Sequence, residues 1–250
     1  MRALIAVVVI TTAVAGRLLA ADTPSCAVPD YLLSGDYTLK RVAAAVSRNH
    51  KLAIAVLGTG SSTLAGANGP SLAYPARLEA LLNQRLSMVA VQVASQTKNG
   101  QTADTMRRSM KELLAAKPDL VIWQTGTVDA IRRVEPDEFR MALETGVDAL
   151  RAGGADVILM NMQYSPRTES MIALSPYADD MRAAAQQREV PLFDRFAIMR
   201  YWADESVFDF YVTERDTGLA QRVHECLGRA LGTLVIAAAH LQSFENKTGK

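Results

Sequence analysis

Serine and threonine hydroxyls gather in the loop Gly-Thr-Gly-Ser-Ser-Thr, residues 58–63. The loop follows a short apolar run of β-forming residues, 52–57, and precedes an amphipathic helix that carries Leu78, Leu81 and Leu82. A strand, loop and helix of this kind open an α/β fold, in which catalytic and ligand-binding groups collect just past the carboxyl ends of strands. A serine becomes a nucleophile when a histidine takes its proton, so this loop is the first place to look for function.

Three histidines could supply a base, and they are scattered along the chain. His50 precedes the first expected strand, at the opposite end of the sheet, and His240 lies in the tail, which leaves His224 on the last expected helix. Because no pair has the spacing of metal ligands, we expect no metal site. The loop also lacks the third glycine of a dinucleotide fingerprint and the Lys-Ser/Thr of a P-loop, so we expect no cofactor.

The first 21 residues have the pattern of a secretory signal peptide. Arg2 is followed by an apolar stretch, 3–16, and by small residues up to Ala21. The stretch is short for a bilayer span, although Arg17 and the leucines after it leave an uncleaved anchor as an alternative. We expect cleavage, which gives a periplasmic or secreted protein without a membrane span.

Residues 22–250 are then expected to form one α/β domain. The whole chain has 250 residues, of which 49% are hydrophobic and 21% charged, enough for a full core. Without residues 1–21 the chain has 25 Lys and Arg against 26 Asp and Glu. This balance gives no support for binding to nucleic acid or to an anionic membrane.

Two cysteines, Cys26 and Cys226, could form a disulfide in an exported protein. The bond would close almost the whole mature chain into one loop and tie the N-terminal segment onto the last helix. On the loop-entropy model it would contribute about 3–5 kcal/mol to stability. Two unrelated buried thiols are the alternative.

Strand and helix patterns alternate along the rest of the chain. This rhythm predicts a parallel sheet with right-handed crossovers, in a three-layer α/β/α sandwich. The expected strands are 52–57, 88–94, 119–124, 157–160 and 190–193. The expected helices are 38–48, one ending near 85, one from about 102 to 116, one ending at 153–154, 170–188 and 219–239, with loops at 95–101 and 125–136 and a frayed tail at 242–250.

Several blocks of the chain resemble the SGNH, or GDSL-type, hydrolases, in the family's order. These are the loop at 58–63, Asn-Gly-Gln-Thr at 99–102, Gly-Thr-Val-Asp at 126–129 and an acidic loop before the final helix. Four further stretches are similar to an exported proteobacterial branch of that family: YPARL at 74–78, LVIWQTGT at 120–127, GADVIL at 154–159 and FAIMRYW at 196–202. The resemblance implies a flavodoxin-like fold with a five-stranded parallel sheet, and ester hydrolysis as the family's activity.

The resemblance also assigns a nucleophile and an oxyanion donor, and this chain departs from both. Counting back from Tyr74 places Gly60 at the nucleophile position, and a serine is recovered only by shifting one residue to Ser61. Val128 stands where the family has an asparagine that donates to the oxyanion. By analogy with other oxyanion donors, that loss lowers the rate about 100- to 1,000-fold.

Backbone donors of the oxyanion site are retained. Gly100 matches the family glycine whose N–H points into that site, and Gly126 opens the next block. With the amides of Gly60 and Ser61, these positions could still hold an anionic or carbonyl oxygen. The resemblance therefore implies a pocket that could bind a ligand that it no longer cleaves.

The last block departs most from the family, which places an Asp and a His three residues apart before the final helix. Counting back from Cys226 gives Arg215 and Gly218 at these two positions. Asp216 could be a displaced acid, but His224 lies six residues after the family position, about 9 Å along a helix. The simpler interpretation of His224 is a helix histidine near the disulfide.

Two functions remain open from the sequence. The favoured one is an exported SGNH-fold protein without esterase chemistry, a binding or scaffolding protein of the envelope for a small acyl or carbohydrate ligand. The other is an active serine esterase that acts on envelope glycans or lipids, with Ser61 as nucleophile, Asp216 as acid and His224 or water as base.

Overall fold

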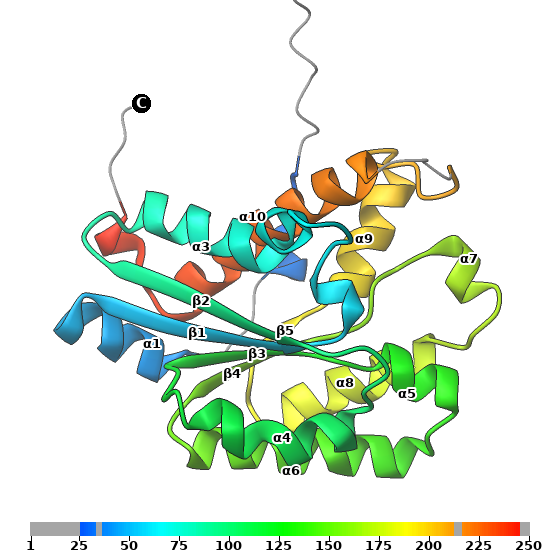
Figure 1. The fold of residues 1–250 in the computed structure, drawn as a ribbon, viewed down its shortest axis with the longest axis horizontal. Helices are drawn as coiled ribbons and strands as arrows, with labels where there is room; N and C mark the ends of the chain where they lie inside the picture. Colours follow the sequence, from blue (N-terminus) through cyan, green and yellow to red (C-terminus); the bar gives the residue numbers. More distant parts are fainter. Residues whose placement is uncertain (1–25, 34–36, 213–216, 246–250) are drawn as a thin grey trace, which may run out of the picture.

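Five parallel strands form one sheet in the computed structural model of the protein, in the order β2-β1-β3-β4-β5 (Figure 1). The structure describes residues 26–33, 37–212 and 217–245, so the expected signal peptide lies outside the described residues. The strands are β1 (Lys51–Gly58), β2 (Ala90–Thr97), β3 (Leu120–Gln124), β4 (Asp156–Met160) and β5 (Leu192–Phe193). The expected fold class is confirmed.

Helices cover both faces of the sheet. In Figure 1, α3 and α10 pack together over one face, while α4, α6 and α8 lie against the other. The helices are α1 (Lys40–Ala44), α2 (Gly69–Leu72), α3 (Tyr74–Arg85), α4 (Ala103–Leu114), α5 (Thr127–Arg132), α6 (Pro136–Ala152), α7 (Pro166–Glu169), α8 (Ser175–Gln187), α9 (Arg195–Asp204) and α10 (Gly218–Ala238). Short π and 3₁₀ turns occur at Ala45–Asn49 and at Asp30–Leu32, Gly60–Ser62 and Gln242–Phe244.

The central strand β3 explains why the sheet needs helices on both faces. All five of its residues, Leu-Val-Ile-Trp-Gln, are buried, as expected for a parallel strand inside a three-layer fold. Helix α6 approaches this strand so closely that a Cβ at Gly146 would overlap the ring of Trp123. The core therefore requires the absence of a side chain at Gly146.

The chain places β2 on one side of β1 and the later strands, β3 to β5, on the other side. Strand β1 pairs with β2 on one side and with β3 on the other, both in parallel. In open α/β sheets a reversal of strand order of this kind opens a crevice outside the carboxyl ends of the two strands. The loops after Gly58 and after Gln124 lie at this crevice, which makes it the place to look for a site.

Several element boundaries differ from the sequence-based expectations. Strand β2 continues to Thr97, into the loop expected at 95–101, because it pairs with β1 along the whole length of both strands. A short helix, α5, occupies part of the loop expected at 125–136. The helix expected from residue 170 begins only at Ser175, with Pro176 in its first turn, and α9 was not predicted.

The expected disulfide between Cys26 and Cys226 is confirmed. It joins the N-terminal segment to α10, and Trp202 of α9 donates a hydrogen bond from Nε1 to the carbonyl oxygen of Ala27, at 3.1 Å. Within the described ranges, no helix combines the length and apolar character that a membrane span requires.

Candidate functional site at the carboxyl edge of the sheet

The loop after β1 is held by a buried glutamine at the end of β3. The Oε1 atom of Gln124 accepts hydrogen bonds from the backbone N–H and the hydroxyl of Thr59 and from the hydroxyl of Ser62, each at 3.0 Å. Ser62 Oγ also lies 2.9 Å from the hydroxyl of Tyr74. Ser62 is therefore a buried structural residue that joins the loop to β3 and α3.

Gly60, at the position that the family resemblance assigns to the nucleophile, lies two residues after the end of β1 and begins a 3₁₀ turn. The space that a side chain would take there is occupied by the Oδ1 atom of Asn99, which would overlap an added Cβ. Asn99 is exposed, so its side chain could turn away from a larger residue. The position thus carries no hydroxyl, and the fold does not forbid one.

Ser61 is bound by the guanidinium of Arg195. Nη1 of Arg195 donates to the carbonyl oxygen of Ser61 at 3.1 Å and to its Oγ at 3.2 Å. The other described neighbour of this hydroxyl is Thr59 Oγ1, at 3.4 Å. Arg195 is 1% exposed, and burial lowers its pKa to about 10, so it remains charged at neutral pH. Ser61 therefore has a cation beside it, where a nucleophile would need a base.

His224 faces a backbone amide. Its Nδ1 accepts a hydrogen bond from the N–H of Tyr74, at 3.0 Å, at the first residue of α3. Burial and, second, the charge of Arg195 lower the pKa of His224 to about 3, which keeps the ring neutral. Because a neutral ring with an accepting Nδ1 carries its proton on Nε2, His224 offers a donor on its other side.

Ser61 and His224 both lie near Arg195, but no described hydrogen bond joins them. Arg195 donates to Ser61, and its charge acts on His224. Among the described residues, no hydrogen bond connects the serine with the histidine. Arg215 and Asp216 lie outside the described residues, and Gly218 is the first residue of α10.

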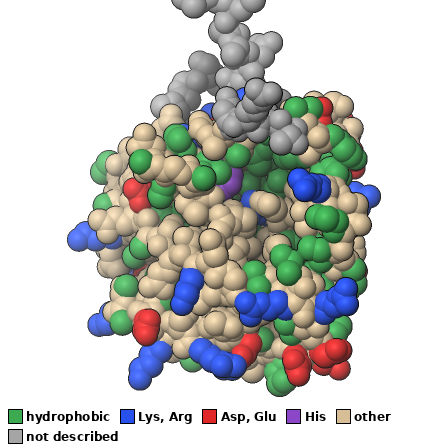
Figure 2. Space-filling view, turned by 45° about the vertical axis from the view of Figure 1, so that its right-hand side comes forward, with side chains coloured by type: hydrophobic (Ala, Val, Ile, Leu, Met, Phe, Trp, Pro, Cys, Tyr) green, Lys and Arg blue, Asp and Glu red, His purple; other side chains and the backbone are tan. Residues whose placement is uncertain are grey.

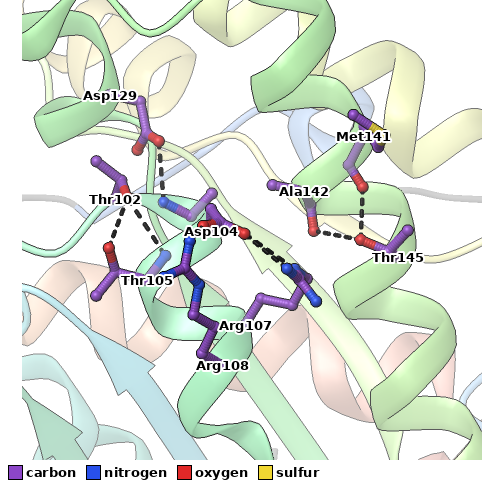
Figure 3. A network of polar contacts seen from close by, with 10 residues as sticks. Thr102, Asp104, Thr105, Arg107, Arg108, Asp129, Met141, Ala142 and Thr145 are labelled. Carbon is purple, nitrogen blue, oxygen red and sulfur yellow. Dashed lines mark hydrogen bonds and ion pairs between the residues drawn. The ribbon is translucent and has the colours of Figure 1, made fainter.

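The other positions expected from the resemblance lie at the ends of β2 and β3. Gly100 and Gly126 have φ values of 73° and 102°, a backbone conformation that favours glycine, and Val128 is half-buried in the first turn of α5. Asp129 is buried, which raises its pKa. It accepts a hydrogen bond from the N–H of Ala103 at 2.9 Å (Figure 3) and another from the hydroxyl of Thr125 at 3.3 Å. Asp129 therefore anchors the start of α4.

The described residues form two cavities beside this edge of the sheet. One, of about 180 Å³, lies beside Arg195 and His224 and is lined also by Gln163, Tyr164, Ser165, Met199, Phe210, Leu219, Ala220 and Val223. The other, of about 390 Å³, lies between α4 and α6 beside the polar network of Figure 3 and includes the ion-paired residues Asp104 and Arg107. In the part of the chain that the structure describes, no group of three His, Cys, Asp or Glu residues could hold a metal ion.

Sequence reasoning missed the residues that connect the candidate site. Arg195 and Gln163 follow β5 and β4, and Gln124 ends β3, so all three come from the carboxyl ends of strands. The available signal was a polar residue at the end of a buried strand or within three residues after it. It was weak because many such residues cap helices, as Asp194 does by accepting from the N–H of Ala197.

Solved hydrolase structures share this fold. TesA has a TM-score of 0.55 and 21% identity, covering 72% of this chain and 99% of that chain. Axe2, an acetylxylan esterase from Geobacillus stearothermophilus, has a TM-score of 0.57 and 19% identity, covering 73% and 94%. LAE5, an α/β hydrolase enzyme from the metagenome of Lake Arreo, Spain, has a TM-score of 0.58 and 21% identity, covering 77% and 95%.

Other matching structures of Axe2 are catalytic mutants in which a serine, an aspartate or a histidine is replaced by alanine. A comparison with curated proteins gave no match. At these identities the structural likeness shows an SGNH/GDSL-type hydrolase fold and no particular substrate. Residues 25–241 match the model of the non-GDSL lipase-like family, and the chain belongs to this family.

Proposed function

We propose that this protein is a non-catalytic member of its hydrolase family that binds a small acyl or carbohydrate ligand at the carboxyl edge of the sheet. The observation that carries the proposal is the hydrogen bond between His224 Nδ1 and the N–H of Tyr74. The lone pair of Nδ1 is taken by the amide, and Nε2 carries the proton, so neither nitrogen is free to accept a proton from a serine.

The surroundings of the candidate nucleophile support the same proposal. Ser61 Oγ has Arg195 Nη1 and Thr59 Oγ1 as its described neighbours, and neither group is a base at neutral pH. Gly60 has no hydroxyl and Val128 has no donor for an oxyanion. Ser, Asp and His are the residue types replaced in the catalytic mutants of Axe2. The described residues around Ser61 and Gly60 do not form such a set, which supports the non-catalytic proposal.

One observation favours the competing function, an active serine esterase that uses Ser61. A guanidinium within hydrogen-bond distance of a hydroxyl stabilises the deprotonated form of that hydroxyl. In that function Asp216 would be the acid, and water or His224 the base.

The intact mass of the mature protein after reaction with a fluorophosphonate decides between the two functions. The probe reacts with an activated serine and needs no knowledge of the substrate. We expect no adduct on protein that is folded and carries the Cys26–Cys226 bond, under conditions that fully label an active SGNH esterase. An adduct that maps to Ser61 and disappears in Ser61→Ala would refute the non-catalytic function.

We place the protein outside the cytoplasm, in the envelope or secreted. The support is the Cys26–Cys226 disulfide, since such bonds persist mainly in oxidising compartments, together with the signal-like pattern of residues 1–21. Expression of the full chain and of a chain without residues 2–21 tests this. We expect only the full chain to form the disulfide and to be found in the extracytoplasmic fraction. If both chains were distributed equally between the cell fractions, export would be contradicted.

A further inference from the structure

Arg195 is a buried cation with an unused donor. Nη1 donates to Ser61, and Nη2 donates to Gln163 Oε1 at 3.0 Å, but the Nε–H has no acceptor among the residues that the structure describes. The residue is 1% exposed, so water outside the protein does not solvate the guanidinium freely. A buried charge is unfavourable unless it is paired and fully hydrogen-bonded, which leaves Arg195 with an unmet requirement.

No carboxylate among the described residues meets this requirement. The neighbouring Asp194 accepts hydrogen bonds from Asn161 Nδ2 and from the N–H of Ala197, and it pairs with Arg182 at 2.7 Å. Within the described ranges, no Asp or Glu forms an ion pair with Arg195. Among the described residues, the guanidinium is therefore a cation without an anionic partner.

The cavity beside Arg195 combines donors with apolar walls. His224 lines it and, as the Nε2–H form, has a donor remaining. Met199, Phe210 and Val223 supply apolar surface to the same cavity, and none of the described Asp or Glu residues lines it. Figure 2 shows a face of the molecule on which hydrophobic side chains and a histidine surround a hollow. A cavity lined by both donors and apolar side chains suits an anion with an apolar tail.

The size of the cavity limits the tail. Its volume is about 180 Å³. An apolar cavity of about 150 Å³ holds benzene, so this one accommodates a chain or ring of about six carbons. We propose that the cavity binds a small monocarboxylate with an apolar tail of about this size, with the carboxylate on Arg195 and the tail among Met199, Phe210 and Val223.

This inference rests on the proposed binding function and narrows its ligand to the acyl class. A carboxylate could also be presented by a sugar, as in an uronic acid. The apolar lining disfavours that source, because burying sugar hydroxyls without partners is unfavourable. The two sources share the carboxylate and differ in the tail, so a comparison of probes separates them.

Titration calorimetry on the mature protein with its disulfide intact tests the proposal. The probes are hexanoate, hexanamide, acetate and glucuronate. We expect hexanoate to bind at least about tenfold more tightly than hexanamide, which lacks the charge, and than acetate, which lacks the tail. Equal affinity for hexanoate and hexanamide, or no binding of hexanoate at millimolar concentration, would refute the carboxylate assignment. Tighter binding of glucuronate would refute the acyl assignment.

A pair of variants on the same helix locates the site. Arg195→Gln removes the buried cation, while Arg200→Gln removes an exposed one whose ion pair with Glu169, at 3.8 Å, is long. We expect Arg195→Gln to abolish the preference for hexanoate over hexanamide and Arg200→Gln to retain it. The same loss in both variants would contradict the site.

Nuclear magnetic resonance of the unmodified protein covers the case in which Arg195→Gln does not fold. We expect hexanoate, and not hexanamide, to shift one arginine Nε–H signal, and Arg200→Gln to leave that signal in place. The absence of any arginine shift at saturating hexanoate would refute the site. Fluorophosphonate labelling, which tests the proposed function, is a separate readout, so either idea can fail without the other.

Discussion

The N–H of Tyr74 donates to His224 Nδ1 at 3.0 Å, which joins the first residue of α3 to the second turn of α10. The first N–H groups of a helix have no partner inside the helix, and here a buried histidine from another helix supplies one. The two rings also lie near each other, with centroids 5.8 Å apart. His224 is therefore the group that holds the start of α3 against α10, and this role occupies its lone pair.

The first prediction concerns the acid stability that this bond determines. Because the pKa of His224 is about 3 in the fold and about 6.5 when unfolded, protonation favours the unfolded chain. The stability that the neutral His224 contributes to the fold is fully present above about pH 6.5 and is lost as the pH falls toward 3. His224→Gln keeps an acceptor and removes the titration. We expect the stability advantage of the wild type over this variant to shrink by about 2–4 kcal/mol between pH 7 and pH 4.

Urea denaturation of both proteins at several pH values measures this difference. Other titrating groups, such as the buried Asp129, are common to both proteins and largely cancel in the comparison. Parallel pH profiles for the wild type and His224→Gln would show that His224 titrates normally.

The second prediction concerns the family's nucleophile and oxyanion positions. Gly60→Ser with Val128→Asn restores the hydroxyl and the amide donor, and the exposed Asn99 side chain can move aside. We expect this double variant to stay unlabelled by a fluorophosphonate, because no base is added. Gly60→Ala with Val128→Asn is the matched control without the hydroxyl. Labelling of the serine variant alone would mean that a base is already present.

The third prediction concerns the disulfide. The bond joins residues 200 apart in sequence, so the loop-entropy model gives it about 5 kcal/mol as an upper value. We expect the double variant Cys26→Ala and Cys226→Ala to lose about 3–5 kcal/mol in urea denaturation. A reductant should lower the stability of the wild type to a similar level and leave the double variant unchanged. A wild type that is insensitive to complete reduction would argue against a stabilising bond.

The fourth prediction concerns Gln124, which accepts three hydrogen bonds from Thr59 and Ser62. Gln124→Leu keeps a similar side-chain size and leaves buried donors without an acceptor. We expect a loss of about 2–3 kcal/mol. Gln96→Leu, on an exposed position of β2, is the control and should change stability by less than about 0.5 kcal/mol. Equal effects of the two substitutions in chemical denaturation would show that the Gln124 hydrogen bonds contribute little.

Local sequence patterns predicted most of the secondary structure. They were less accurate where contacts with another strand or helix determine the structure of a segment. The apolar run of β3, which begins shortly after Pro118, was sufficient to predict that strand. A strand that is buried on both faces has a continuous run of apolar residues. The end of β2 was not predicted, because its polar residues up to Thr97 belong to the strand only through their pairing with β1. The helix α9 was not predicted, although its buried residues at 195, 196, 198, 199 and 202 lie at helical spacing.

The sequence by itself determined the class of fold, the approximate positions of the five strands, and a disulfide that only Cys26 and Cys226 could form. Only the tertiary structure decided what the candidate site residues touch. Tyr74 and His224 are 150 residues apart, and Ser61 and Arg195 are 134 apart. Their contacts depend on how α3, α9 and α10 pack beside the sheet, and that packing is set by the whole core, which no local pattern records.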